Sequence, residues 1–512
     1  MPGTSRGSSE IRAGRKPSFL SRLRGSSQRP LRFVPADVQV KILNRSDREE
    51  GPQKTPRTAI RRSLPKSDWL TEHSRLYNRW FAPTLYVGQL PMLRSRLFLS
   101  ISILLTSFQV RAQEPARSPD IAISAKARAI HDSALIVDTH ADTPQRFLEE
   151  NFDIGSTDPR DYGHISLDKV KRGNLGAEFF SIWVEPETNQ GHYAQHTFDL
   201  IDSVYEQAER HRDRMMMAFS VADIERAHKQ HKFAALMGIE GGHSIENDIH
   251  LLRDYYRLGV RYMTLSWSNT NEWADSSGDI NDPKIQHHNG LTDFGKQVVL
   301  EMNRLGMMVD ISHVADKTFW DAIATTKAPV IASHSSARAL VNAPRNMTDD
   351  MLRAVAKNGG VVQVNFYDGF IDEDYRRAME AQSKEQAEAL KKYVDERKAA
   401  GKTVTYLDME TVQREWLAKV QKPPLKSLID HIDHIAKVAG VDHVGLGSDF
   451  DGVSGATPQG IDSAADLPKI TQSLLDRGYS ADDIHKILGG NLLRVFREVE
   501  RISQASSKPS TR

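Results

Sequence analysis

The stretch Ala134–Pro144, ALIVDTHADTP, decides how the chain is expected to fold. Its apolar run covers Leu135–Val137, the length of a short buried strand. A cluster of ionisable residues follows at once: Asp138, His140 and Asp142. A buried strand with such an end either leads into a polar turn or presents metal ligands. The pattern in the rest of the sequence decides between these two interpretations.

Similar apolar runs recur from about residue 125, and segments of helical length separate them. Those segments place apolar residues three and four apart, and several end at a glycine, as at Gly259, Gly306 and Gly440. Strands that alternate with helices indicate a parallel sheet, and eight such units predict an α/β fold of the (β/α)8 TIM-like barrel type. A doubly wound sheet is the alternative. The predicted strands are ALIVDTH, GAEFFSIWV, FAALMGIEGG, RYMTLSW, GMMVDISH, APVIASHS, GVVQVNFY and HVGLGSDFDG.

Polar and ionisable side chains recur at the C-terminal ends of these runs. In a parallel barrel those ends meet at one face, where clustered charges are costly unless a cation neutralises them. Three histidines with several carboxylates suit Zn²⁺, with Mn²⁺, Co²⁺ or Fe²⁺ as alternatives. The residues are His140 and Asp142 on the first strand, Glu240 and His243 on the third, Trp267 on the fourth, His313 on the fifth, His334 on the sixth, and Asp449 and Asp451 on the eighth.

The number of ligands favours two metal ions over one. Five or six ligands exceed what a single zinc needs, so a pair of ions bridged by a carboxylate fits better. Glu240 is the natural bridge, because the flexible EGG turn that contains it lets the backbone approach closely.

Composition excludes several classes of protein. Lys and Arg total 68 against 67 Asp and Glu, so global charge gives no reason to expect a nucleic-acid partner. The 512 residues contain no cysteine, which excludes disulfides, iron–sulfur clusters, thiolate zinc sites and a cysteine nucleophile.

The two ends of the chain are predicted to lie outside the fold. Residues 1–91 are rich in Arg, Ser and Pro and are expected to be disordered, or absent from the natural product if translation starts at Met92. Residues 92–112 have the pattern of a signal peptide, which predicts export to the periplasm or beyond; an uncleaved anchor is the alternative. Residues 113–124 form a linker, and the polar end 501–512 is expected to be a disordered tail without a lipid anchor.

Seven motifs carry a resemblance that spans residues 125–500 in order. They are DTHADTP, GIEGGHSIEND, RYMTLSWSNTNEWADSSG, VDISHV, PVIASHSSARALVNAPRNMTDD, HIDHIAKVAGVDHVGLGSDFDG and GGNLLRVF. With these motifs the chain resembles the renal (membrane) dipeptidase family, the zinc dipeptidases of peptidase family M19, which have amidohydrolase-like barrels. The resemblance implies a metallo-dipeptidase that hydrolyses dipeptides with a metal-activated hydroxide, and it extends to dipeptides with a D-residue on the C-terminal side.

The same resemblance implies the ligands of two zinc ions and three further roles. One zinc is held by His140, Asp142 and Glu240, and the second by Glu240, His313 and His334. Asp449 is implied to contact the substrate and transfer protons, beside Glu240 as the other catalytic carboxylate. Arg345 is implied to bind the substrate's terminal carboxylate, which a guanidinium can grip with two parallel hydrogen bonds.

Trp267 departs from the family pattern. The relatives commonly have a histidine there, which contacts the scissile carbonyl. One alternative is that the indole N–H of Trp267 donates a hydrogen bond in place of that histidine. The other is that the indole closes the pocket, in which case the substrate is another small amide, a lactone or an N-acyl amino acid. A metal-binding or peptide-binding protein that has lost catalysis is a third alternative. Asp451 is expected to cap the following turn, and His243 to orient a metal ligand.

A charged segment separates the seventh and eighth predicted strands. Residues 370–424 contain two helical patterns, DEDYRRAMEAQSKEQAEALKKYVDERKAAG and YLDMETVQREWLAKV. This helical insertion is expected beside the mouth of the barrel, where it shapes the pocket or forms the contact of a homodimer.

Overall fold

The computed structural model describes residues 121–402 and 404–506. The predicted disordered segment 1–91, the signal peptide 92–112 and residues 113–120 of the linker lie outside these ranges. Among the described residues, no helix is both long enough and apolar enough to cross a bilayer.

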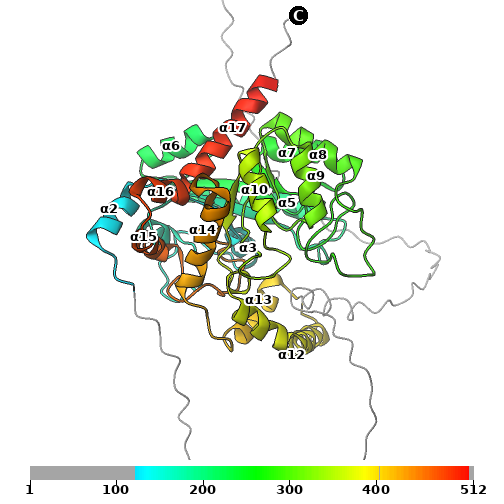
Figure 1. Ribbon diagram of the computed structural model, residues 1–512. Coiled ribbons are helices and arrows are strands. Elements are labelled where there is room, and N and C mark those ends of the chain that lie inside the picture. Colours follow the sequence, from blue (N-terminus) through cyan, green and yellow to red (C-terminus); the bar gives the residue numbers. More distant parts are fainter. Residues whose placement is uncertain (1–120, 403, 507–512) are drawn as a thin grey trace, which may run out of the picture. The chain divides into compact units, whose positions relative to one another are not determined.

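Within the described part of the chain, eight parallel strands form a nearly closed barrel, which confirms the predicted fold (Figure 1). Consecutive members pair side by side. The barrel closes between its first and last strands, where Asp449 N–H donates to His140 O (3.0 Å) and Asp142 N–H to Phe450 O (2.8 Å). The strands are β1 (Ile136–Ala141), β2 (Leu175–Trp183), β4 (Phe233–Glu240), β5 (Val260–Thr264), β6 (Met308–Asp310), β7 (Ile331–Ala332), β8 (Val361–Val364) and β9 (Val444–Leu446).

One further strand was not predicted. β3 (Met215–Met217) pairs with the first residues of β4, Phe233–Ala235. Its three methionines show no alternation of apolar and polar residues, so the pattern that identifies strands is missing.

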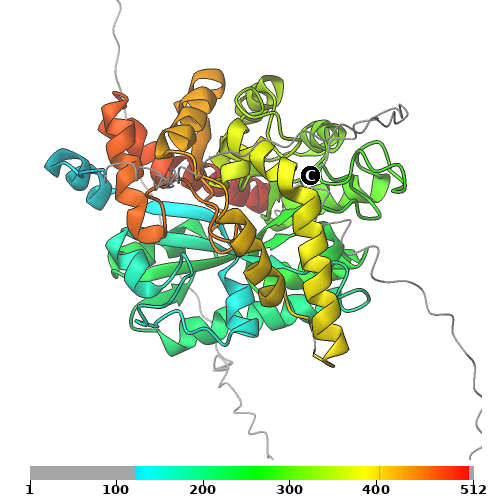
Figure 2. The ribbon, with the colours of Figure 1, turned by 90° about the horizontal axis from the view of Figure 1, so that it is seen from below.

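Helices connect the strands and cover the outside of the barrel (Figure 2). The predicted helix ends at Gly259, Gly306 and Gly440 are confirmed, since these residues follow helices with φ of 105°, 89° and 96°. The helices are α2 (Ala125–Ser133), α3 (Thr143–Glu149), α4 (Leu167–Arg172), α5 (Tyr193–Arg210), α6 (Val221–Lys229), α7 (Ile249–Arg257), α8 (Asp293–Leu305), α9 (Asp316–Thr325), α10 (Asp349–Asn358), α14 (Leu425–Ala439), α15 (Leu467–Asp476) and α16 (Ala481–His485).

The predicted helical insertion is confirmed between β8 and β9. It comprises α11 (Asp368–Ile371), α12 (Glu373–Ala399) and α13 (Tyr406–Leu417). The sparse apolar faces of the two longer helices meet in a small cluster of their own: Leu390, Val394, Met409 and Val412. In Figure 1, α12 and α13 lie at one end of the barrel and the last helix at the other.

That last helix, α17 (Asn491–Ser506), packs against the N-terminal halves of the strands. Phe496 contacts Phe179 of β2 edge-on at 6.3 Å between ring centroids. The prediction of a disordered tail from residue 501 is wrong for 501–506, because Ile502 still packs on this cluster and holds the last turns in place. Residues 507–512 lie outside the described ranges.

Candidate metal centre

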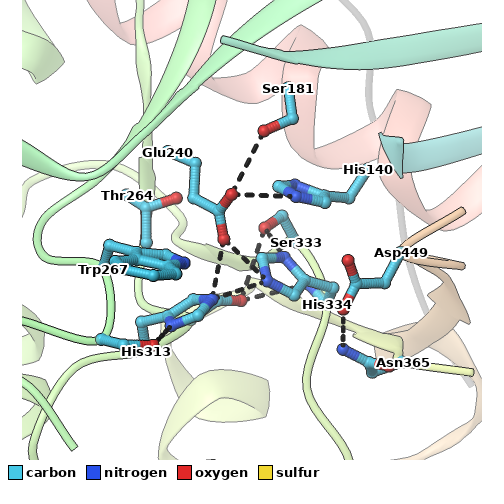
Figure 3. A network of polar contacts seen from close by, with 12 residues as sticks. His140, Ser181, Glu240, Thr264, Trp267, His313, Ser333, His334, Asn365 and Asp449 are labelled. Atoms are coloured by element: carbon cyan, nitrogen blue, oxygen red, sulfur yellow. Dashed lines mark hydrogen bonds and ion pairs between the residues drawn. The ribbon is translucent and has the colours of Figure 1, made fainter. Parts of the chain in front are cut away.

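The five predicted ligands lie together at the C-terminal end of the barrel, around the carboxylate of Glu240. Figure 3 shows four of them: His140, Glu240, His313 and His334. Glu240 Oε1 is 2.8 Å from His313 Nε2 and 3.4 Å from His334 Nε2. Glu240 Oε2 is 3.4 Å from His140 Nε2, which is also 3.5 Å from Asp142 Oδ2. Each carboxylate oxygen of Glu240 therefore faces a different group of imidazoles.

The nitrogen atoms are arranged for a cation. The Nε2 atoms of His313 and His334 are 2.9 Å apart, so at most one of them carries a proton toward the other. His140 Nε2 is buried and has no hydrogen-bond partner among the described residues. Imidazole nitrogens and carboxylate oxygens that converge in this way form the donor set of a zinc site, so these residues fit the metal.

The protonation states also suit metal binding. Burial and the nearby charge of Arg345 lower the pKa of His313 to about 3, and burial together with His140 lowers the pKa of His334. Burial opposes ionisation of Glu240, but the surrounding histidines hold its pKa well below the usual range. Neutral imidazoles and an ionised carboxylate are the forms that bind metals.

His140 shows the opposite shift. Burial acts against its charge, but the pKa of His140 is raised, because Tyr262, Glu240 and Asp142 together outweigh burial. The field of the protein therefore favours a positive charge at this point of the site.

The backbone takes unusual conformations to direct these side chains inward. His313 and Asp449 have φ of 65° and 63°, in the left-handed region that non-glycine residues rarely adopt. Each such residue costs about 1–3 kcal/mol and is typical of functional sites. After Glu240 the chain needs glycine, since a Cβ at Gly242 would lie 2.5 Å from Leu265 O.

A second set of polar side chains makes hydrogen bonds to the predicted metal ligands. Such contacts fix the orientation of a ligand and the nitrogen that it presents to the metal. The sequence did not identify them. They are Tyr262 OH with His140 Nδ1 (2.9 Å), Ser333 Oγ with His334 Nδ1 (2.8 Å), and Ser181 Oγ, which donates to Glu240 Oε2 (3.2 Å).

Asp449 lies beside the ligands and remains partly exposed. Its Oδ2 accepts a hydrogen bond from Asn365 Nδ2 (2.9 Å), a residue that the sequence did not identify. The buried surroundings raise the pKa of Asp449 to about 7, with the negative charges of Asp142 and Glu240 adding to the shift and His140 opposing it. A carboxyl group with this pKa can exchange protons near neutral pH.

Arg345 is buried next to the ligands, with 6 % of its surface exposed. Its Nη2 donates to His334 O (3.0 Å) and its Nη1 to Ser335 Oγ (3.2 Å). Its Nε has no hydrogen-bond partner in the described part of the chain. Burial lowers the pKa of Arg345 to about 10, so the group stays charged at neutral pH.

Trp267 borders the site on the side of His313, with 6.3 Å between their ring centroids. Figure 3 shows the indole pointing toward Glu240 and the histidines. It is partly exposed, and its ring is 4.9 Å from that of the buried Trp183.

Two expectations about neighbouring residues are wrong. Asp451 does not cap the following turn: its φ of 63° turns the carboxylate away, toward His164 N–H (2.6 Å) and Thr143 Oγ1 (2.7 Å). His243 does not orient a ligand. It lies in the 3-10 turn after β4, and its Nε2 pairs with Val184 O at 2.8 Å instead.

Comparisons with known proteins identify the family of the chain. The membrane dipeptidase profile (peptidase family M19) matches residues 124–510. Human dipeptidase 3 is 32% identical over 408 residues, which cover 77% of this chain and 71% of that protein. Dipeptidase aclJ of Aspergillus oryzae is 34% identical over 352 residues, 67% of this chain and 72% of the relative. The crystal structure of the probable dipeptidase PvdM from Pseudomonas aeruginosa has a TM-score of 0.61 and 27% identity, and the match covers 74% of this chain and 98% of PvdM. The chain therefore belongs to the membrane dipeptidase family, peptidase family M19, and is a metallo-dipeptidase.

Proposed function

We propose that the protein is an exported dipeptidase that binds two zinc ions and hydrolyses the peptide bond of dipeptides, including those with a D-residue on the C-terminal side. One observation carries the proposal. The two carboxylate oxygens of Glu240 face different imidazoles, with Oε2 toward His140 and Oε1 toward His313 and His334. A carboxylate in this position can bridge two ions.

The ligands divide into two sets around this bridge. His140, Asp142 and Glu240 would hold one zinc, and Glu240, His313 and His334 the other. When bound, the two ions supply Lewis-acid polarisation of the substrate carbonyl and lower the pKa of a water molecule.

Asp449 would move the protons of the reaction. Asn365 occupies Oδ2, which leaves Oδ1 to accept a proton from the attacking water and return it to the leaving amine. Gly452 gives this atom room, since a Cβ there would lie 2.6 Å from Asp449 Oδ1.

Arg345 would bind the terminal carboxylate of the substrate. It is charged, and its Nη2 bonds the carbonyl of the ligand His334 itself. A terminal carboxylate held directly beside a predicted metal ligand supports dipeptides as the substrate, rather than longer peptides.

Trp267 would donate its indole N–H to the carbonyl oxygen as negative charge develops there. A second candidate function follows from the same residue. An indole beside His313 also narrows the site, which would suit another small amide, a lactone or an N-acyl amino acid.

Export to the periplasm or beyond is part of the proposal, supported by the signal-peptide pattern of residues 92–112. A homodimer formed through the insertion α12–α13 is also proposed. Sequencing the N-terminus of the exported protein, with Gln113 expected first, tests export, and sedimentation of wild type against a chain lacking the insertion tests the dimer.

The test of the activity is hydrolysis of L,L- and L,D-dipeptides beside N-acyl amino acids, with zinc quantified on the same sample. We expect dipeptide turnover with two zinc ions per chain, lost on chelation and restored by zinc. Glu240→Gln should lose zinc and activity, whereas Glu272→Gln, an exposed glutamate, should lose neither. Turnover of N-acyl amino acids alone would support the second candidate, and bound zinc without turnover of any substrate would reject both.

A further inference from the structure

We infer that Trp183 and Trp267 form an aromatic subsite for the N-terminal residue of the substrate, so that the enzyme prefers dipeptides with a large apolar N-terminal side chain. This inference rests on the proposed dipeptidase function.

The two indoles form one wall. Their ring centroids are 4.9 Å apart and their planes are inclined by 57°. Trp183 is the last residue of β2, and Trp267 follows the end of β5. Trp183 is buried and Trp267 is partly exposed, so the second ring presents the wall to the open site.

The order of strands places Trp183 opposite Arg345, whereas Trp267, after β5, lies two strands from β7 and beside His313. Going round the barrel, β7 is four strands from β2 in either direction. Arg345 is tied to the end of β7 through its bond to His334 O, whereas Trp183 ends β2. The metal ligands lie between them at the centre of the mouth.

A dipeptide that spans this mouth has a fixed direction. Its terminal carboxylate lies at Arg345 and its scissile carbonyl at the metal ligands. Its N-terminal residue then reaches the side of Trp183, where the partly exposed indole of Trp267 adjoins. Aromatic faces bury apolar side chains well, and they also attract a positively charged amine. They offer no solvation to an acidic side chain.

Selectivity among dipeptides tests this subsite. With the zinc-loaded full chain, kcat/KM is measured for four substrates that share C-terminal alanine and carry phenylalanine, leucine, glycine or aspartate at the N-terminus. Hydrophobic pockets discriminate about 10–200-fold per methylene group, so we expect at least about tenfold preference for phenylalanine and leucine over glycine. Trp267→Ala and Trp183→Ala should each lower the phenylalanine-to-glycine ratio by about tenfold.

Matched variants distinguish a change in substrate selectivity from a loss of folding. Trp320→Ala removes an indole on α9 that is 42% exposed, and it should leave the ratio unchanged. Trp183→Phe keeps an aromatic ring in case Trp183→Ala fails to fold, and it should retain most of the preference. A second readout is the inhibition constant of phosphinic analogues of the phenylalanine and glycine substrates, and the preference for the phenylalanine analogue should fall in Trp267→Ala and Trp183→Ala.

The outcomes distinguish this inference from the proposed function. Dipeptide turnover with equal kcat/KM for the four substrates, or an unchanged ratio in Trp267→Ala, would overturn the subsite and leave the dipeptidase function intact. Failure to hydrolyse any dipeptide would overturn both.

Discussion

Replacing Asp451 with asparagine tests how the loop after β9 is held. The carboxylate of Asp451 is 2% exposed and accepts hydrogen bonds from His164 N–H (2.6 Å) and Thr143 Oγ1 (2.7 Å). The positive charge of Arg146 acts on it as well. Asp451→Asn keeps the shape, removes the negative charge and turns one accepting oxygen into a donor.

The magnitude follows from these contacts. One donor, from His164 or Thr143, loses its acceptor, which costs about 1–3 kcal/mol in a buried place. Arg146 forms its ion pairs with Glu150 and Asp161, and its attraction to Asp451 acts at longer range. This attraction adds to the lost hydrogen bond, so we expect a loss of about 3 kcal/mol at pH 7, the upper end of that range.

The loss should depend on pH with a definite sign. Burial opposes the charge of Asp451, but the hydrogen bonds of His164 and the charge of Arg146 hold its pKa well below the usual range. The folded protein therefore binds this proton less readily than the unfolded chain does. The contribution of Asp451 is complete above the usual carboxyl pKa of about 4 and is lost as the pH falls below it.

Urea unfolding followed by circular dichroism, in the same metal-loading state at pH 7 and at about pH 3.5, gives the free energy of unfolding of each variant. Asp462→Asn, at an exposed aspartate, is the control and should change little. A loss below about 1 kcal/mol at pH 7, or a difference from wild type that grows as the pH falls, would refute the reasoning.

Three further changes have expected outcomes. Phe496→Ala should lower the free energy of unfolding in urea by about 3–5 kcal/mol, because loss of the ring leaves a cavity between α17 and the strands. Phe198→Ala, at an exposed phenylalanine, should lower it little. Glu178 is buried with no hydrogen bond to either oxygen from the described residues, and burial raises its pKa. The folded state then holds this proton more tightly, so wild-type stability should fall as the pH rises above about 4.3, and Glu178→Gln should flatten that fall across a pH series. Ser454→Ala removes the bond to Glu410 of α13 (2.5 Å) and should cost about 2 kcal/mol, as calorimetry would measure.

Much of the fold was predictable from local pattern. Apolar runs and amphipathic segments alternate regularly, and the ionisable residues stand at the ends of the runs, so topology alone gathers them. β3 lacked such a pattern, since Met215–Met217 alternate neither in size nor in polarity. The first turns of the predicted C-terminal tail were missed because Ile502 is a single apolar residue in a polar stretch.

The supporting contacts of the site could not be predicted in the same way. Tyr262 bonds His140 across 122 positions of the sequence, and Asn365 bonds Asp449 across 84. Such pairs depend on the register between distant strands, which hydrophobic periodicity does not specify. Asp451 was misjudged for a related reason, because its left-handed backbone conformation, and not its place in the sequence, sets the direction of its side chain.

The position of α17 constrains how the protein is made. β1 is synthesised first among the strands, yet its neighbour β9 and the helix that covers Phe179 come last. A nascent chain on the ribosome therefore holds an incomplete barrel with an uncovered apolar end until its final helix has emerged. Shielding of that surface during translation, rather than the speed of any single helix, should determine how much of the newly made protein escapes aggregation.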